Sequence, residues 1–547
     1  MPDPSSPAPL PTGYLLRNFQ QVLAWASNLY SDLLTPAEQE FCQRFDLLPE
    51  PARHLYLRLL TRKGPYIPVK SLDYEEVPDT DQALDALVQG EFALLNPAAD
   101  SGLLLNRINK ADLRALFKTP LPASAGKADW ISAITEQYSA EQIRQTVAGF
   151  QPFVQACHDD IFATFLLLFF GNGRQDLSEF VISDLGHVRY ENYRVCPRTR
   201  YFNSREEIEV LRQYLQARDV LDEPELLANT DALLALFAQL PFHQNKPELV
   251  RRFEKIAIPI ARQLERLQQD EKALAIYRQC ESHPSHERQA RILAKQEQVE
   301  DSLQLCRGIL QTSRHPEAVE FAWKFGTRLA RKHQRPFPAE APFQLNEFSL
   351  QTRNTGDPVE LIAAALLSDG EHDCYYVENV LFCGLFGLYF WDIIFAPIAG
   401  AFFNPFQRGP KHLNSEFFYR DRADLIDTKL QQMEQSGWSQ ILWQHFFEKQ
   451  NVANPFVFWE ALNEKLIALT LEKVPAPHLQ AIFRQLASHP GFFASGFPDL
   501  IRFSASGYEL IEVKGPGDRL QPNQRRWFRR FHNAGIQARL LNVSWTD

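Results

Sequence analysis

Residues 496–515 read GFPDLIRFSASGYELIEVKG, and the C-terminal part of the chain is organised around them. The second half of this stretch, residues 508–513, is rich in β-forming residues and lies between glycine-containing turns, so it predicts a short strand. Side chains on a strand alternate between its two faces, so Glu512 and Lys514 should point the same way, with Ile511 and Val513 on the packed face. The strand therefore has one face that can do chemistry.

A second carboxylate, Asp499, opens the apolar run 500–503, and twelve residues separate it from Glu512. If residues 498–503 pair with the strand as a hairpin arm, the two carboxylates approach across the ladder, where opposite residues lie roughly 5 Å apart. They would repel unless a cation lay between them, and oxygen ligands suit Mg²⁺ or Mn²⁺ rather than zinc. Lys514 could then lower the pKa of an attacking water, orient it, or balance phosphate charge. The pattern predicts a metal-dependent phosphodiester-cleaving site, although surface strands also carry such charges by accident.

The wider context resembles the PD-(D/E)xK nuclease superfamily. Gly-Phe-Pro-Asp-Leu at 496–500 and Glu-Val-Lys-Gly-Pro-Gly-Asp-Arg-Leu at 512–520, followed by Gln524 and Trp527, are similar to its virus-type replication-repair (VRR-NUC) branch. Within that branch, the length and upstream sequence resemble the Fanconi-associated nuclease family. The resemblance implies a mainly α, multidomain chain that ends in an α/β core of αβββαβ order with a mixed sheet. It also implies a structure-selective DNA nuclease that cuts near 5′ flaps, trims 5′ to 3′ and serves interstrand-crosslink repair.

The resemblance further assigns roles to individual residues. One or two Mg²⁺ or Mn²⁺ ions would be held by three side chains and one main-chain carbonyl, those of Glu378, Asp499, Glu512 and Val513. Lys514 would position the water, and Gln524 would orient the site. Glu378 could instead be a charge at a helix N-terminus. Asp392 lies fourteen residues further on, about 21 Å along a straight helix, so we expect a satisfied buried carboxylate there rather than a ligand of the same metal.

Composition limits the class of protein. The 547 residues suggest three or four domains, and 57 Lys and Arg against 67 Asp and Glu give a net charge of −10. This balance excludes a protein that coats nucleic acid through bulk positive charge, so a DNA-binding surface must be local. The seven scattered cysteines form no Cys-x-x-Cys pair, which indicates a reducing cytoplasm and no zinc site. We expect a bacterial, cytoplasmic member without the ubiquitin-binding zinc finger of the animal members, and the sequence identifies no protein partner.

Two segments could be mistaken for targeting signals. Residues 1–12 are rich in proline and serine and lack the basic and apolar regions of a signal peptide, so we expect a disordered lead. Residues 381–403 are apolar, carry Asp392 as their only charge and are long enough to span a bilayer. The central charge and the absence of a cationic flank favour a buried helix and no membrane partner.

Upstream of the nuclease the apolar periodicity is mostly helical. We expect a helical region at 13–75, a SAP-like DNA-binding region at 76–200, tetratricopeptide-like repeats at 201–340 and the nuclease domain at 345–547. A helix-loop-helix at 108–134 resembles a SAP-type hairpin, although a purely structural hairpin fits equally well. The basic residues around it that could contact DNA are Arg107, Lys110, Lys118 and Lys127. Strand-like patches at 180–182 and 187–190 have no assigned function.

The repeats and the last helix complete the prediction. Residues 271–278 and 300–307 match at an offset of 29, and we favour a rigid spacer over a platform for partners. Residues 521–534 predict a helix with a basic ridge that favours contact with the DNA backbone: Arg525, Arg526, Arg529 and Arg530. The resemblance implies that the DNA partner is branched and has a 5′ flap. Two rival functions remain, a Holliday-junction resolvase-like endonuclease and a non-enzymatic repeat scaffold with a vestigial nuclease.

Overall fold

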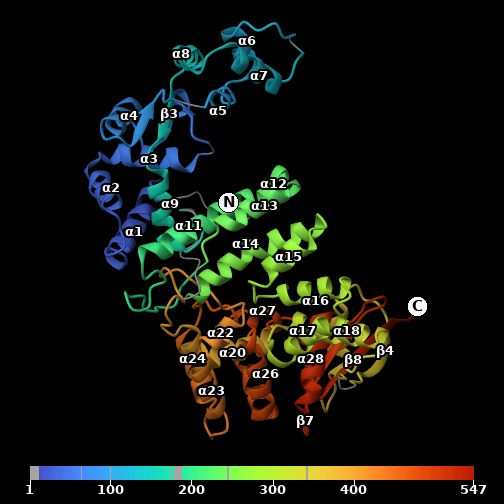
Figure 1. The fold of residues 1–547 in the computed structure, drawn as a ribbon. Helices are drawn as coiled ribbons and strands as arrows, with labels where there is room; N and C mark the ends of the chain where they lie inside the picture. The colour runs from blue at the N-terminus through green and yellow to red at the C-terminus, as the bar shows by residue number, and fades with distance from the viewer. Residues whose placement is uncertain are drawn as a thin grey trace. The chain divides into compact units, whose positions relative to one another are not determined.

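The computed structural model describes residues 12–62, 64–98, 100–122, 124–173, 175, 177, 188–242, 246–339 and 343–546 (Figure 1). Residues 1–11 of the lead expected at 1–12 lie outside the described residues, and so does the strand-like patch at 180–182. Of the patch at 187–190, Arg189 forms an isolated parallel bridge with Val452. The chain divides into two compact units, residues 1–187 and 188–547, which are described separately.

The first unit is a helical bundle with a small sheet. Its helices are α1(Tyr14–Leu29), α2(Pro36–Leu47), α3(Glu50–Thr61), α4(Thr80–Gln89), α5(Ser101–Leu105), α6(Lys110–Leu116), α7(Lys127–Gln137), α8(Ala140–Phe150) and α9(Asp159–Phe170). The antiparallel sheet has the order β1(Ile67–Pro68), β3(Phe153–Ala156), β2(Ala93–Leu95). The helix-loop-helix expected at 108–134 is present as α6 and α7. Its two helices pack around Leu113, Phe117 and Ile134, with Ile143 of α8.

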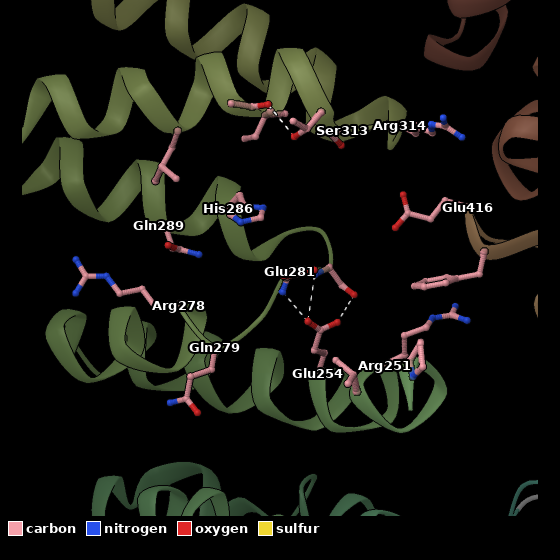
Figure 2. Close-up of a pocket in the computed structure, with 18 of the residues that line it drawn as sticks. Arg251, Glu254, Arg278, Gln279, Glu281, His286, Gln289, Ser313, Arg314 and Glu416 are labelled. Carbon is pink, nitrogen blue, oxygen red and sulfur yellow. Dashed lines mark hydrogen bonds between the residues drawn. The ribbon is translucent and has the colours of Figure 1, made fainter. Parts of the chain in front are cut away.

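The second unit begins with antiparallel helix pairs. They are α11(Arg205–Val220), α12(Pro224–Ala228), α13(Thr230–Gln239), α14(Pro247–Arg266), α15(Asp270–Tyr277), α16(Ser285–Lys295), α17(Val299–Thr312) and α18(Pro316–Lys332). The small residues at matching repeat positions, Ala273 and Ser302, are fully buried, and the Ser302 hydroxyl donates to the carbonyl of Ala290 at 2.7 Å. Between these helices and residues 416–423 lies a cavity of about 1400 Å³, with Glu281 and His286 on its wall (Figure 2).

The C-terminal part contains a five-stranded mixed sheet. Its strands are β4(Asn346–Thr352), β5(Asp373–Tyr376), β6(Leu500–Ser504), β7(Gly507–Lys514) and β8(Ala538–Trp545), in the spatial order β4-β8-β7-β6-β5. Pairing is antiparallel for β5–β6 and β6–β7 and parallel for β7–β8 and β4–β8. With α19(Val359–Leu367) and α28(Pro522–Asn533), this gives the order α19-β5-β6-β7-α28-β8. The αβββαβ core with a mixed sheet is therefore confirmed, and β4 adds an edge strand.

Each face of this sheet has its own core, as period-two alternation requires. Leu500, Ile511 and Val513 pack on one face with Ala363 of α19. Residues of the opposite face, among them Ile501 and Leu510, belong to a larger core that includes Trp527 of α28. Because both faces are covered, polar side chains at the strand ends are held in a buried setting.

A helical insertion separates β5 from β6. It contains α20(Val380–Tyr389), α21(Trp391–Ile394), α22(Phe417–Arg420), α23(Ala423–Gln432), α24(Gln440–Glu448), α25(Glu464–Lys473), α26(Ala476–Ser488) and α27(Pro490–Phe493). The segment expected as a buried helix over 381–403 is mostly buried but forms two helices, because α20 ends at Tyr389 and irregular backbone follows α21. Among the described residues, none of the helices has the length and apolar character needed to cross a bilayer.

The expectation that Asp392 is buried is wrong. The break at Phe390 starts a new short helix, and the Asp392 side chain on it is 61% exposed. The carboxylate lies 3.3 Å from His445 Nε2 and 3.9 Å from Lys429 Nζ. Asp392 is therefore satisfied by two partners at the surface of the helical insertion, and it is not a competitor for the metal site.

Candidate active site

The β6–β7 hairpin brings Asp499 and Glu512 together as the spacing predicted. The register pairs Leu500 with Ile511, which places the preceding Asp499 opposite Glu512. Asp499 Oδ2 accepts a hydrogen bond from the Val513 N–H at 2.8 Å. The two carboxyl groups are close enough that the charge of Asp499 raises the pKa of Glu512.

Glu512 and Lys514 share one face of β7, also as predicted. Lys514 Nζ lies 2.7 Å from Glu512 Oε1, and the two side chains are 12% and 0% exposed. Val513, between them, points into the opposite core with Leu541. The hairpin therefore places two carboxylates and one ammonium group in a single buried corner of the sheet.

Glu378 is tied to the same corner by main-chain bonds. It lies two residues after the end of β5, and the N–H groups of Val377 and Glu378 both donate to the Asp499 carbonyl, at 2.8 and 3.0 Å. Its φ of 34° lies in the left-handed region, which a non-glycine residue rarely adopts, so the backbone is strained here. Its carboxylate accepts from the Tyr376 hydroxyl at 2.6 Å and from Asn379 Nδ2 at 2.9 Å. These bonds hold an acidic side chain beside Asp499, whose pKa it raises.

A fourth carboxylate, Glu360, acts on the site and is not apparent from the sequence. It lies in the first turn of α19, which packs against β6 and β7, and its charge also raises the pKa of Asp499. Glu360 is 139 residues before Asp499 in the chain and belongs to no motif in the nuclease stretch. Its position after Pro358 predicts only a helix start, so the sequence carries no signal that would have linked it to the site.

The electrostatics of the corner fit a divalent cation. Burial is the main cause that raises the pKa of Asp499 to about 6, and burial together with the Asp499 charge raises that of Glu512 to about 8. Glu512 Oε2 is buried and has no hydrogen-bond partner among the residues that the structure describes. An unpaired buried carboxylate oxygen is costly. Several clustered oxygen donors of this kind suit Mg²⁺ or Mn²⁺, whose charge would return both groups to the ionised form.

Gln524 supports this corner from the start of α28. Its Oε1 accepts from the Gln521 N–H at 2.9 Å in a capping box, and its Nε2 donates to Glu512 Oε1. The close approach of this helix requires Gly496, which has a φ of 86° and no room for a side chain, because a Cβ atom would lie 2.9 Å from the main-chain carbonyl carbon of Asn523. Trp527 is a core residue that stacks on Phe497 at a ring distance of 4.1 Å.

The four arginines of α28 do not form one exposed ridge. Arg526 is directed inward, where it forms an ion pair with Glu320 of α18 at 3.0 Å and lies over the ring of Phe492. This ion pair fastens α28 to α18, which argues against the predicted contact of Arg526 with DNA and leaves that contact to be tested by mutation. All four arginines, Arg525, Arg526, Arg529 and Arg530, line a cavity of about 740 Å³ between the same two helices, together with α18 residues.

The other predicted DNA-binding residues lie in the first unit. The structure places Arg107, Lys110, Lys118 and Lys127 at the ends of α6 and α7 and in the segments beside them. Lys118 is exposed, and Lys127 Nζ donates to the Asn106 carbonyl at 2.7 Å. The α6–α7 hairpin therefore gathers basic residues in one place, in the unit that does not carry the carboxylates.

Comparisons with known proteins agree with this geometry. Residues 433–545 match the model of the VRR-NUC domain, and residues 13–94 match that of the FAN1, HTH domain. The Fanconi-associated nuclease 1 homolog of Pseudomonas aeruginosa is 32% identical over 99% of this chain and 97% of its own length. The homolog of Arabidopsis thaliana is 26% identical over 98% of this chain and 67% of its own length. A crystal structure of paFAN1 bound to 5′ flap DNA with a two-nucleotide flap and a gap superimposes with a TM-score of 0.81, at 30% identity, and covers 99% of this chain and all of its own.

Proposed function

Because this chain belongs to the Fanconi-associated nuclease family, and is thus a DNA-cleaving hydrolase, we propose that its preferred substrate is branched DNA with a 5′ flap. We further propose that it trims DNA from 5′ to 3′ and takes part in interstrand-crosslink repair. The similarity to a relative crystallised with 5′ flap DNA, which extends over nearly the whole chain, supports the substrate. The observation that carries the chemistry is the buried carboxylate pair with an unpaired oxygen beside Lys514.

The nuclease requires a divalent cation, and we propose Mg²⁺ or Mn²⁺, one or two ions per site. The groups that would hold the ions are Glu378, Asp499, Glu512 and the carbonyl of Val513. When bound, such an ion activates water and stabilises the departing oxygen of the phosphodiester. The role of the fold is to bring carboxylates from the end of β5 and from the β6–β7 hairpin into one corner.

The remaining groups act on the water and on the carboxylates. Lys514, 2.7 Å from Glu512, lowers the pKa of that carboxyl group against the larger effect of burial and presents N–H donors to a water molecule at the site. Gln524 fixes the rotation of Glu512 through its amide N–H. A carboxylate held from two sides keeps its geometry during the reaction.

DNA would be held by basic residues away from the carboxylates. We propose phosphate contacts for Arg107, Lys110, Lys118 and Lys127 in the first unit and for Arg525, Arg529 and Arg530 on α28. Phosphate contacts position a duplex without reading its sequence, which suits an enzyme that selects a DNA shape. Such local basic groups also reconcile DNA binding with a net charge of −10.

A cleavage assay tests the proposal directly. The purified chain should cut a labelled 5′ flap in Mg²⁺ or Mn²⁺ and leave a four-way junction of the same sequence largely intact. Asp499→Ala and Lys514→Ala should each lower the cleavage rate by at least a hundredfold and leave DNA binding in the presence of Ca²⁺ unchanged. Preferential cleavage of the junction would favour the resolvase alternative, and unchanged cleavage by both variants would show that the nuclease activity lies elsewhere.

A further inference from the structure

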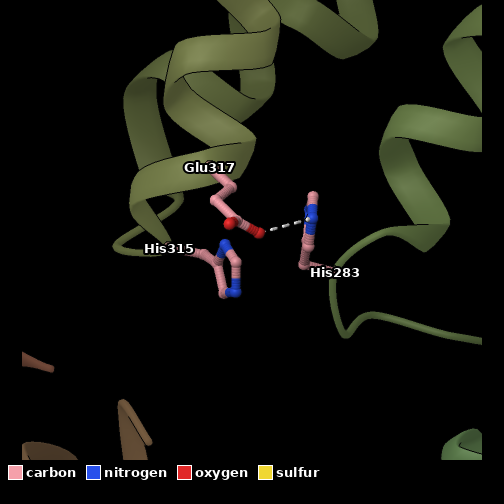
Figure 3. A group of neighbouring side chains, drawn as sticks. All are labelled: His283, His315 and Glu317. Carbon is pink, nitrogen blue, oxygen red and sulfur yellow. Dashed lines mark ion pairs between the residues drawn. The ribbon is translucent and has the colours of Figure 1, made fainter. Parts of the chain in front are cut away.

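Three side chains outside the nuclease site converge at the turns of the repeats. His283 lies in the α15–α16 turn, His315 comes just before α18, and Glu317 is in the first turn of α18 (Figure 3). Each offers one nitrogen or oxygen atom, and these three atoms lie within 4.8 Å of one another. His283 Nε2 is 3.5 Å from the Glu317 carboxylate, and the two imidazole rings stack at 4.2 Å.

The imidazoles lack the partners that buried polar groups normally have. Nδ1 of His283 and Nδ1 of His315 are buried without a hydrogen-bond partner in the part of the chain that the structure describes, and the same holds for Nδ1 of the neighbouring His489. Leaving buried nitrogens unpaired costs free energy. The cluster is therefore incomplete as a network of hydrogen bonds within the protein.

Burial and charged side chains of both signs surround the two imidazoles. Burial is the main cause that lowers the pKa of His315 to about 3 and also lowers the pKa of His283. Arg526 adds a positive charge near His315, but it is paired with Glu320 at 3.0 Å. On the other side, Glu287 and Glu317 place negative charge near His283. Two imidazoles and one carboxylate therefore meet in one place, and the nearby arginine is already paired.

We propose that His283, His315 and Glu317 bind a transition-metal ion of the zinc type, which links the α15–α16 turn to the start of α18. Nitrogen and carboxylate donors around Zn²⁺ lie at roughly 2.0–2.2 Å from the ion, so donors in a tetrahedral site are roughly 3.5 Å apart. The His283–Glu317 distance of 3.5 Å already meets this value. Two histidines and one carboxylate leave a fourth position for water, and His283 and His315 line a cavity of about 490 Å³ that can supply it.

This ion would differ in chemistry and in role from those of the nuclease. The nuclease corner offers mainly oxygen, whereas this cluster offers two nitrogens, which Mg²⁺ binds poorly. Consecutive repeats meet at the cluster, and the ring of His315 also contacts His489 at 5.6 Å and Phe492 at 4.7 Å, residues that precede β6. A metal here would fasten the repeats where they meet the nuclease insertion. The inference does not depend on which DNA the nuclease cuts.

Cobalt replacement tests the site with the full chain. The protein is stripped with a chelator, supplied with excess Mg²⁺ to occupy the nuclease corner, and titrated with Co²⁺. We expect one equivalent to produce the strong visible absorption of a four-coordinate site with nitrogen ligands, and Zn²⁺ to displace it. One equivalent of Zn²⁺ should also raise the melting temperature.

Variants decide whether these residues are the ligands. Glu317→Gln and His315→Gln should each weaken Co²⁺ binding at least tenfold and abolish the thermal shift, whereas the nearby His286→Gln and the nuclease variant Asp499→Asn should keep both. Glu317 is half exposed, so Glu317→Gln should melt with the wild type in chelator, which verifies its folding. The proposal is overturned if the wild type shows no absorption at one equivalent, or if the signal survives in Glu317→Gln and is lost in Asp499→Asn.

Discussion

Replacing Glu512 by glutamine should stabilise the metal-free protein while it abolishes cleavage. Glu512 is fully buried, and its pKa rises from 4.5 to about 8 in the fold. Because the folded pKa lies above the unfolded one, the stability tied to this group is intact below pH 4.5 and is lost as the pH rises toward 8. At pH 7 the loss is roughly 3 kcal/mol, from the 1.36 kcal/mol that accompanies each pKa unit.

The glutamine side chain removes this cost and keeps most contacts. Its carbonyl oxygen can still accept from Gln524 and Lys514, and the imperfect replacement of the contacts that the protonated carboxyl group makes at pH 7 offsets about 1–2 kcal/mol. Glu512→Gln should therefore be more stable than the wild type by about 1–2 kcal/mol at pH 7 in chelator. The difference should vanish near pH 4.5, and Mn²⁺ should raise the melting temperature of the wild type only.

Thermal melts between pH 4.5 and 8 in EDTA measure the effect, with Glu509→Gln as the matched control. Glu509 lies on the opposite face of the same strand and forms ion pairs with Arg502 and Arg539. Its replacement removes favourable pairs, so that variant should be less stable than the wild type at pH 7. If Glu512→Gln is also less stable than the wild type at pH 7, burial of the Glu512 carboxylate does not destabilise the metal-free protein. That result would refute the argument that this buried carboxylate requires a cation.

Two further predictions concern DNA binding and the geometry of the site. Arg525→Gln should reduce the slope of log DNA affinity against log salt concentration by about one unit. Arg526→Gln should leave that slope unchanged and lower the melting temperature, because Arg526 is paired with Glu320. Equal slopes for the two variants would contradict the different roles of these two arginines. Gly496→Ala should lower stability by about 1–3 kcal/mol and weaken cleavage, because φ is 86° and the added methyl group meets the start of α28. A variant with the melting temperature and cleavage rate of the wild type would contradict this.

The sequence predicted the hairpin because the information is local. Alternation along β7 determines the shared face of Glu512 and Lys514, and the spacing to Asp499 determines which residues lie opposite each other. The order of elements in the sheet followed from the family resemblance and agrees with the structure. Local pattern therefore predicts the orientation of side chains wherever a strand has one polar and one apolar face.

Other features depend on contacts between distant segments, which a single sequence does not encode visibly. Arg526 resembles its three neighbours in sequence, and only the packing of α18 against α28 shows that it is an internal ion-pair partner. The break at Phe390 escaped the hydropathy pattern because both parts of 381–403 are apolar. The His283 and His315 cluster was missed because cysteine spacing can reveal or exclude only thiolate sites.

The site also explains how an insertion of more than a hundred residues is tolerated between β5 and β6. The two strands pair directly, and the Asp499 carbonyl accepts from the N–H groups of both Val377 and Glu378, so the insertion begins and ends at one point. Its helices therefore extend from the acidic corner without separating Glu378 from Asp499. The strained φ of Glu378 follows from this arrangement. The main chain of Glu378 is held by its bond to the Asp499 carbonyl, and the chain must turn away from the sheet directly after it. The geometry of the acidic corner thus depends on the strand pairing and not on the length of the insertion.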